Sequence, residues 1–332
     1  MNIQHSAFNV QRFALSAVLC VLIFSLAACT ADVQTIGKIT LEKDTVWSGS
    51  ILIDGDIYVP PGTTLTIKPG TMVKFKRIDA DSGRNLFETD SPYYPQAEII
   101  VRGKIIARGT KDKPIVFTSS EVTASPADWG AINLLGSRDN VFEHCKVLCA
   151  YNGIHAHSSS ALISHSEFMK NGVAITYKKE YEFPNLPWFD QECDVVITHN
   201  LIHKNKGGIS FRASKTRISN NEIRDNKFFG VWAKEESSGT VSYNEILENG
   251  KNIFLYQIKG VKIEFNNIYD GREYDIAIAE EQDTDVQIGN NWLGTGNREK
   301  IEEMVFDKMD DPELSRIIYE PLLKSSVKEA GL

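Results

Sequence analysis

The chain has 332 residues, of which 42% are hydrophobic and 24% are charged. This composition is that of a globular protein with enough apolar material for an extended core, and it excludes a disordered or fibrous chain. The formal net charge of −8 offers no basic surface, so no nucleic-acid partner is expected. The 23 glycines, many of them between short apolar runs, favour an all-β chain.

The N-terminus has the features of a targeting segment. Arg12 precedes the apolar stretch Phe13–Ala28, which is too short for a comfortable transmembrane span. The stretch runs into the sequence LAAC at residues 26–29, which resembles the bacterial lipobox. That resemblance implies a lipoprotein signal peptide over residues 1–28, lipidation of Cys29, and attachment to a membrane of the cell envelope. Because no aspartate follows Cys29, it implies the outer rather than the inner membrane. An ordinary signal peptide is the alternative.

A short sequence motif recurs along the chain. It consists of a polar residue or cysteine, then any residue, then an apolar residue. Successive copies are 21 to 25 residues apart, except for one step of 34. A period of about 22 residues indicates stacked supersecondary units. Within a unit, apolar and polar residues alternate in three short runs separated by turns, which predicts strands and no helix. The motif begins at Cys145, Ser166, Asn200, Asn221, Asn244, Asn266 and Asn291.

Three short strands in a coil of about 22 residues are the parameters of a right-handed parallel β-helix. Each position then stacks on its counterpart in the next coil. Asparagine tolerates the left-handed conformation of a tight bend, and its amide can bond to turn backbone and to the next asparagine. We therefore interpret the recurring asparagines as a structural ladder rather than as sugar contacts. The ladder comprises Asn200, Asn221, Asn244, Asn266 and Asn291, and a second column contains Asn171, Asn205, Asn226 and Asn249.

Two further stretches support this fold. "DWGAINLL" at Asp128–Leu135 leads into the repeat, and an Asn-Trp-x-Gly turn with a closing Pro-Leu lies within Gly289–Leu323. Over residues 50–323 the chain resembles bacterial envelope proteins of the right-handed parallel β-helix superfamily. This is the pectate-lyase-like group with carbohydrate-binding and sugar-hydrolase domains and PbH1-type repeats. The predicted fold class is all-β, a single-stranded right-handed parallel β-helix with a short C-terminal capping helix.

The expected organisation has four parts: a signal peptide (1–28), a tether and entry to the solenoid (29–49), the β-helix (50–296) and a C-terminal cap of helix plus strand (297–332). The apolar spacing of Ile301, Met304, Val305 and Met309 predicts that the capping helix covers Arg298–Met309.

The resemblance implies that the third strand of each coil lines a sugar groove. Basic and aromatic side chains there are suited to stacking on sugar faces and pairing with uronate carboxylates. A solvated outer sheet face is the alternative. The outward residues align in one column as His155, Ala174, Ser210 and Trp232, and in a second as His157, Thr176, Arg212, Lys234 and Tyr256.

The step of 34 contains about 12 residues more than an ordinary coil, and they fall within Lys178–Cys193. Its aromatic residues Tyr181, Phe183 and Trp188 are unfavourable to expose without a partner, and loops on rigid scaffolds often carry function. We therefore expect them to bind ligand. A flap that packs them against the barrel wall is the alternative. Arg77–Gln96 is a second insertion.

Enzymatic activity is left open by the sequence. Glu222 and Glu245 fall on adjacent coils, about 5 Å apart by the rung spacing, which is compatible with retaining glycoside hydrolysis. Arg212 or Lys234 would be the base of a lyase. However, nothing resembles the paired aspartates of polygalacturonases, the Arg-x-Pro-x-x-Arg segment of pectate lyases or the Asp-Pro-His run of alginate epimerases. If the protein is an enzyme, it is expected to be a polysaccharide lyase or a glycoside hydrolase.

Three groups of residues raise the question of metals and disulfides. An acidic column makes Ca²⁺ conceivable, with exposed turns as the alternative and no other cofactor expected. A histidine column reads as a further ladder, with a metal site as the alternative. Three cysteines could form one disulfide and a free thiol, or remain three buried thiols. These groups are Asp225, Glu248 and Asp270; His144, His165 and His199; and Cys145, Cys149 and Cys193.

The sequence thus predicts a monomeric, lipid-anchored protein of the cell envelope whose β-helix binds polysaccharide or an envelope protein through an outward groove. A polysaccharide-active enzyme is the first alternative, and a structural surface protein without a ligand is the second.

Overall fold

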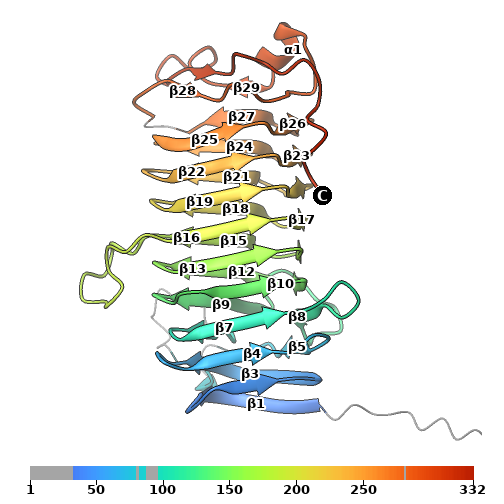
Figure 1. The fold of residues 1–332 in the computed structure, drawn as a ribbon, viewed down its shortest axis with the longest axis vertical. Helices are drawn as coiled ribbons and strands as arrows, with labels where there is room; N and C mark the ends of the chain where they lie inside the picture. The colour runs from blue at the N-terminus through green and yellow to red at the C-terminus, as the bar shows by residue number, and fades with distance from the viewer. Residues whose placement is uncertain (1–32, 80–81, 87–95, 280–281) are drawn as a thin grey trace, which may run out of the picture. The chain divides into compact units, whose positions relative to one another are not determined.

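The computed structural model describes residues 33–79, 82–86, 96–279 and 282–332. Residues Asp32–Leu332 form one compact unit, and almost all of its regular structure is short parallel strands stacked along one axis (Figure 1). Cys29, the signal peptide and part of the second insertion lie outside the described residues. No helix in the described part is long and apolar enough to cross a membrane.

Each complete coil contributes one strand to each of three stacks, as β16, β17 and β18 do (Figure 1). The first stack is β2 (Thr45–Trp47), β4 (Thr64–Ile67), β7 (Lys104–Arg108), β10 (Asn140–Glu143), β13 (Ser160–Ser164), β16 (Asp194–Thr198), β19 (Lys215–Ser219), β22 (Ser238–Ser242) and β25 (Gly260–Glu264). The second is β5 (Met72–Phe75), β8 (Ile115–Ser119), β11 (Cys145–Leu148), β14 (Glu167–Met169), β17 (Leu201–His203), β20 (Glu222–Arg224), β23 (Glu245–Leu247) and β26 (Asn267–Tyr269). The third is β6 (Ile99–Val101), β9 (Trp129–Leu135), β12 (Ala150–His157), β15 (Val173–Lys178), β18 (Gly207–Arg212), β21 (Phe229–Lys234), β24 (Lys251–Tyr256), β27 (Tyr274–Ile278) and β29 (Val305–Phe306).

The N-terminal end is built from two longer strands. β3 (Ser50–Val59) pairs with β5 through its first half and with β6 through its second, so it serves two stacks. β1 (Val33–Thr40) lies before residue 50, where the sequence predicts the solenoid to begin, and pairs in parallel with β3.

The core runs through the middle of the coils. One inward position of most strands is occupied by isoleucine or valine, and the positions stack from coil to coil. In the second stack, Ile202, Ile223, Ile246 and Ile268 are all completely buried. Burying a side chain of this size stabilises the fold by about 2 kcal/mol.

Buried asparagines connect the coils at two corners. Asn200, Asn221, Asn244 and Asn266 each donate from the side-chain amide to the side-chain oxygen of the next ladder residue, at 2.9–3.0 Å, and the series ends at Asn291. The second column, Asn171, Asn205, Asn226 and Asn249, is bonded in the same way and continues to Asn252. Every amide also bonds to backbone carbonyls, so these buried polar groups are satisfied.

The ladder asparagines do not themselves adopt the left-handed conformation of the bend. The conformational reason predicted for their recurrence is therefore wrong. The residue before each one has the positive φ, as at Asn220 (54°), Tyr243 (57°) and Phe265 (59°). The ladder side chain instead turns inward to bond the backbone of the bend. His144, His165 and His199 also occupy this bend position, with φ between 49° and 55°.

The C-terminal cap closes the last coil. Helix α1 (Arg298–Glu302) begins at Asn297, whose side chain accepts a hydrogen bond from the backbone N–H of Glu299. The helix is shorter than the predicted Arg298–Met309, because the carbonyl of Met304 accepts hydrogen bonds from the last coil and the following residues form β29 beside β27. Met309 is consequently 72% exposed. Strands β28 (Val286–Gln287) and β30 (Ile317–Ile318) pair in parallel with each other.

The predicted all-β, parallel β-helix architecture is therefore confirmed, with a minimal capping helix. Of the open alternatives for the cysteines, the structure has three buried free thiols, Cys145, Cys149 and Cys193.

Candidate functional site

The outward face of the third stack carries two columns of side chains, fixed by strand register. The first column is Ile100, Asn133, His155, Thr176, Ser210, Trp232 and Phe254. The second column is Leu135, His157, Lys178, Arg212, Lys234 and Tyr256.

This register corrects the sequence alignment at one strand. Thr176 belongs to the first column, Lys178 stands between His157 and Arg212 in the second, and Ala174 points into the core. The alternation is broken at the start of β15, where Ala174 and Ile175 are buried in succession. A strict two-residue period therefore misplaces the strand.

A loop between β15 and β16, residues Lys179–Cys193, forms a flap (Figure 1, yellow-green). Trp188 is only 6% exposed, because it packs on Ile100 and Leu135. Gly136 permits this contact: it has a φ of 60°, and a Cβ there would lie 2.6 Å from the Cβ of Trp188. By contrast, Phe183 is 43% exposed. Part of the flap thus packs against the barrel, while its tip stays open.

A buried polar network lies under the base of the flap. Asn133 donates to Glu98 Oε2 (2.6 Å) and presents its oxygen to His155 Nδ1 (3.0 Å). The Nε2 atoms of His155 and His157 are 2.9 Å apart, and His157 Nδ1 lies 2.8 Å from Glu180 Oε2. With His155 Nδ1 donating, its Nε2 accepts from His157. His157 and Glu180 must then share one further proton.

The environment of this network shifts the pKa values of its members. Complete burial, together with nearby Asp56, raises the pKa of Glu98 well above its ordinary value and so favours its neutral form. Burial and the neighbouring His157 lower the pKa of His155. Burial opposes ionisation of Glu180, but hydrogen bonds from His157 and from the backbone of Glu182 outweigh it and lower its pKa. The histidines expected to bind ligand thus hold the base of the flap.

Towards the C-terminal end, the same face carries cations on aromatic rings. We call Tyr181, Arg212, Trp232, Lys234 and Phe254 the cation–aromatic strip. The Arg212 guanidinium lies 4.5 Å from the centre of the Tyr181 ring, and Lys234 Nζ lies 4.0 Å from that of Trp232. Phe254 stacks on Trp232 with ring centres 5.2 Å apart. Tyr256 follows Lys234 in the second column and is half-buried.

The two cations of the strip differ in whether an acidic group forms an ion pair with them. Glu235 lies 2.8 Å from Arg212 Nε and also accepts the hydroxyl of Tyr181. No acidic group among the described residues forms an ion pair with Lys234. Burial, followed by the nearby charge of Arg212, lowers the pKa of Lys234 to about 8. The buried indole nitrogen of Trp232 also lacks a hydrogen-bond acceptor in the described chain. The strip therefore has unused capacity for an anion.

The carboxylates proposed for catalysis lie on the second stack, away from the strip. Glu222 and Glu245 are direct neighbours in register. However, Arg224 bonds to Glu222, while Asn267 and Tyr269 each donate to Glu245 at 2.6 Å. Both carboxylates are occupied by neighbours on the same surface, and Arg212 and Lys234 do not approach them in register.

The acidic column proposed for calcium occupies bend positions, with φ near 54° at Asp225, Glu248 and Asp270. Asp225 is paired with Arg272 at 2.9 Å. These three residues are not among the groups whose ligand atoms converge in the described part of the chain.

One group of side chains in the described residues could hold a metal ion. Ligand atoms of Glu143, His144 and His165 all lie within 4.8 Å of one another. The ring centres of His144 and His165 are 5.0 Å apart, and His199 stacks on His165 at the same spacing. Imidazole nitrogens with a carboxylate oxygen suit Zn²⁺ or Cu²⁺ better than Ca²⁺. A metal site at these histidines was the alternative that the sequence left open. The structure adds Glu143 to its candidate ligands.

Some members of these sites were absent from the sequence prediction. Phe254 lies ten residues after Asn244, just as His155 lies ten after Cys145, and a uniform offset from the repeat would have found it. No sequence pattern indicated Glu98 or Glu180, because their hydrogen-bond partners are 35 and 23 residues away along the chain.

The described chain is thus a right-handed parallel β-helix with a flap and a cation–aromatic strip on one outward face. It belongs to the NosD family, described as periplasmic copper-binding protein, whose model matches residues 115–305, more than half of the chain. A second model, the pectate-lyase like beta helix domain, matches residues 33–181.

Solved structures that match the chain include the periplasmic alginate epimerase AlgG, at 15% identity and a TM-score of 0.36, covering 73% of this chain and 61% of that one. A variant of AlgG matches at 11% identity and a TM-score of 0.42, covering 84% and 71%. The chain therefore spans about three fifths of the first of these structures. No curated protein matches it in sequence.

Proposed function

We propose that this protein is a cell-envelope β-helix protein that binds an acidic polysaccharide along the cation–aromatic strip. The observation that carries the proposal is Lys234, held over the Trp232 ring without an ion pair among the described residues, since nearby Glu235 is paired with Arg212. A half-buried cation with a depressed pKa gains from any carboxylate that reaches it.

The neighbouring groups suit a uronate ligand. Trp232 and Phe254 supply ring surface for the apolar face of a sugar. The strip follows the solenoid axis, since successive members come from successive coils. An extended polymer would therefore contact several coils at once.

The proposed location combines two observations. The family model is described as periplasmic, and the sequence at residues 26–29 resembles a lipobox. We therefore propose that Cys29 carries lipid and anchors a monomeric protein to the outer membrane. Metabolic labelling with a palmitate analogue tests this: wild type should incorporate the label, and Cys29→Ala should not.

The binding proposal is tested by titrating residues 32–332 with polygalacturonate and with neutral dextran, with calcium and with chelator, while following intrinsic fluorescence. Polygalacturonate should bind and dextran should not. Trp232→Ala should abolish the response at an unchanged melting temperature, whereas Tyr243→Ala, an exposed aromatic at another corner, should bind normally. Equal binding by Trp232→Ala would refute the site. Unsaturated products absorbing in the ultraviolet would instead show a lyase.

The convergence of Glu143, His144 and His165 favours a second function, copper binding, in keeping with the family description. Two imidazoles and a carboxylate are a suitable donor set for Cu²⁺, although atoms up to 4.8 Å apart must move closer to share one ion. Calorimetry with Cu²⁺ and paramagnetic resonance test this. His165→Ala should lose the nitrogen-coordinated signal, while His199→Ala, outside the converging group, should keep it. A signal unaffected by His165→Ala would reject the site.

A further inference from the structure

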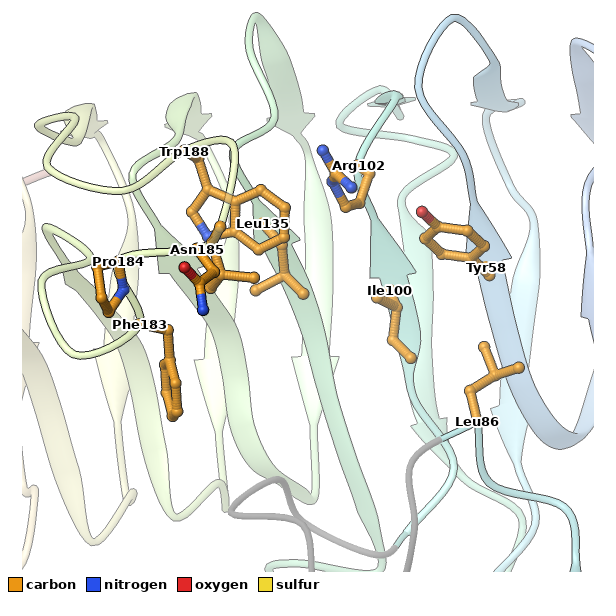
Figure 2. A pocket seen from close by; sticks show the side chains of 10 residues that line it. Tyr58, Leu86, Ile100, Arg102, Leu135, Phe183, Pro184, Asn185 and Trp188 are labelled. Atoms are coloured by element: carbon orange, nitrogen blue, oxygen red, sulfur yellow. The ribbon is translucent and has the colours of Figure 1, made fainter.

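A cavity of about 570 Å³ lies between the flap and the outward face near the N-terminal coils. Figure 2 shows Phe183 and Trp188 of the flap on one side, Tyr58 across from them, and Ile100 and Leu135 on the strands between. This cavity is separate from the cation–aromatic strip, which involves none of its lining residues.

The walls form a second apolar cluster outside the barrel. Ile100, Leu135 and Trp188 are 2%, 4% and 6% exposed, and Tyr58 and Leu186 pack against them. Further along the same two columns, the corresponding positions are mostly polar, as at His155 and Lys178. The face changes character where the flap covers it. Close-packed interiors leave few large voids, whereas small-molecule sites are hollows of roughly 300–1,000 Å³.

Arg102 is the one charged residue that lines the cavity in the described chain. Its guanidinium lies 4.2 Å from the centre of the Trp188 ring, and it has no ion-pair partner among the described residues. Its Nε and the indole nitrogen of Trp188 are both buried without a hydrogen-bond acceptor within the described chain. The cavity thus combines apolar walls with one positive charge.

We propose that this cavity binds one fatty-acid chain, with its carboxylate on Arg102 and its hydrocarbon against Ile100, Leu135 and Phe183. The single cation selects an anionic head group, because a cationic one would be repelled and a neutral one would leave Arg102 uncompensated. The scarcity of polar lining groups disfavours a sugar, whose hydroxyls would lose water without replacement.

The test is calorimetry of residues 32–332 with dodecanoate, dodecanol and dodecyltrimethylammonium, each below its micellar concentration. Dodecanoate should bind at one site, roughly tenfold more tightly than dodecanol, since one charge-assisted hydrogen bond corresponds to about this ratio. Dodecyltrimethylammonium should not bind. Shortening the acid by two carbons should weaken binding roughly tenfold.

Variants separate the parts of the site. Arg102→Gln should bind dodecanoate and dodecanol equally, whereas Arg217→Gln, an exposed arginine on the first stack, should retain the preference. Phe183→Ser, at an exposed position of the flap, should weaken all ligands without changing the melting temperature. Lys234→Gln should bind dodecanoate normally, which keeps this site distinct from the strip.

The proposal is overturned if folded protein shows no saturable dodecanoate binding, or if Arg102→Gln retains the preference for the acid. A copurifying phospholipid that dodecanoate cannot displace, or a second copy of the chain occupying the cavity, would equally contradict it.

Discussion

The ammonium nitrogen of Lys234 lies 4.0 Å from the centre of the Trp232 ring, and both residues belong to β21. Because the two are separated by one inward residue, Ala233, they project from the same face. The ring removes water from one side of the ammonium group without supplying a negative charge. This relationship makes Lys234 the titratable centre of the proposed polysaccharide site.

Binding of polygalacturonate should depend on the protonation of Lys234. Burial lowers the pKa of free Lys234 to about 8, and a bound carboxylate favours the charged form and raises it. Affinity should therefore be constant below pH 8 and fall above it, by up to about tenfold per pH unit. Calorimetry from pH 6 to 9.5 measures this. Lys234→Arg remains charged and should give a flat profile; a flat wild-type profile would contradict the role of Lys234.

Asn221→Leu should destabilise the solenoid by about 2–4 kcal/mol. Asn221 Oδ1 accepts hydrogen bonds from the backbone and side chain of Asn200, and its amide donates to Asn244, so leucine leaves several buried groups unpaired. Urea denaturation followed by circular dichroism gives the change. Asn185→Leu, on the exposed flap, should remain within about 0.5 kcal/mol of wild type. Equal stability of the two variants would show that the ladder does not hold the coils.

Glu98→Gln should stabilise the protein at neutral and alkaline pH. The pKa of Glu98 is raised in the folded state, chiefly by burial, so its contribution is fully present below the unfolded pKa and is lost as pH rises. Glutamine removes that loss and can still accept from Asn133. We expect little difference between Glu98→Gln and wild type at pH 4 and a growing stabilisation of the variant as the pH rises to 8. Exposed Glu121→Gln should show no such trend, and a destabilised Glu98→Gln at pH 8 would refute the neutral acid.

Glu180→Ala should release the flap. Glu180 lies 2.8 Å from His157 Nδ1 and accepts the backbone N–H groups of Glu182 and Phe183. Each charge-assisted bond is worth roughly 1.5–3 kcal/mol, so limited proteolysis within the flap should accelerate at least about tenfold. Glu192→Ala, near the other end of the flap, is the control. Unchanged cleavage would mean that Trp188 alone retains the flap.

The sequence predicted the fold well because the solenoid repeats its chemistry at a fixed period. Asn221 and Asn244 are 23 residues apart and occupy equivalent corners, and their spacing alone implies the stacking that their hydrogen bond provides. The prediction was wrong where the local pattern breaks. Ala174 and Ile175 are buried in succession, and the helix expected up to Met309 ends early to pair a strand with β27.

The side-chain contacts on the outward face were harder to predict, because they join coils whose sequences share no motif there. Trp188 packs on Ile100 and Leu135 from distant parts of the chain, and no periodicity in the flap indicates this. His157 was expected to contact ligand, whereas it faces Glu180 and His155 in a buried network. Long-range polar pairs of this kind become visible only with the fold.

The most direct test of the account is the affinity of residues 32–332 for polygalacturonate at pH 7, measured by calorimetry for wild type and Lys234→Gln. Loss of a charge-assisted contact should weaken binding at least about tenfold. Lys262→Gln, an exposed lysine on the first stack, should bind as wild type does. Equal affinities of wild type and Lys234→Gln, or no binding by well-folded wild type, would contradict the proposed site.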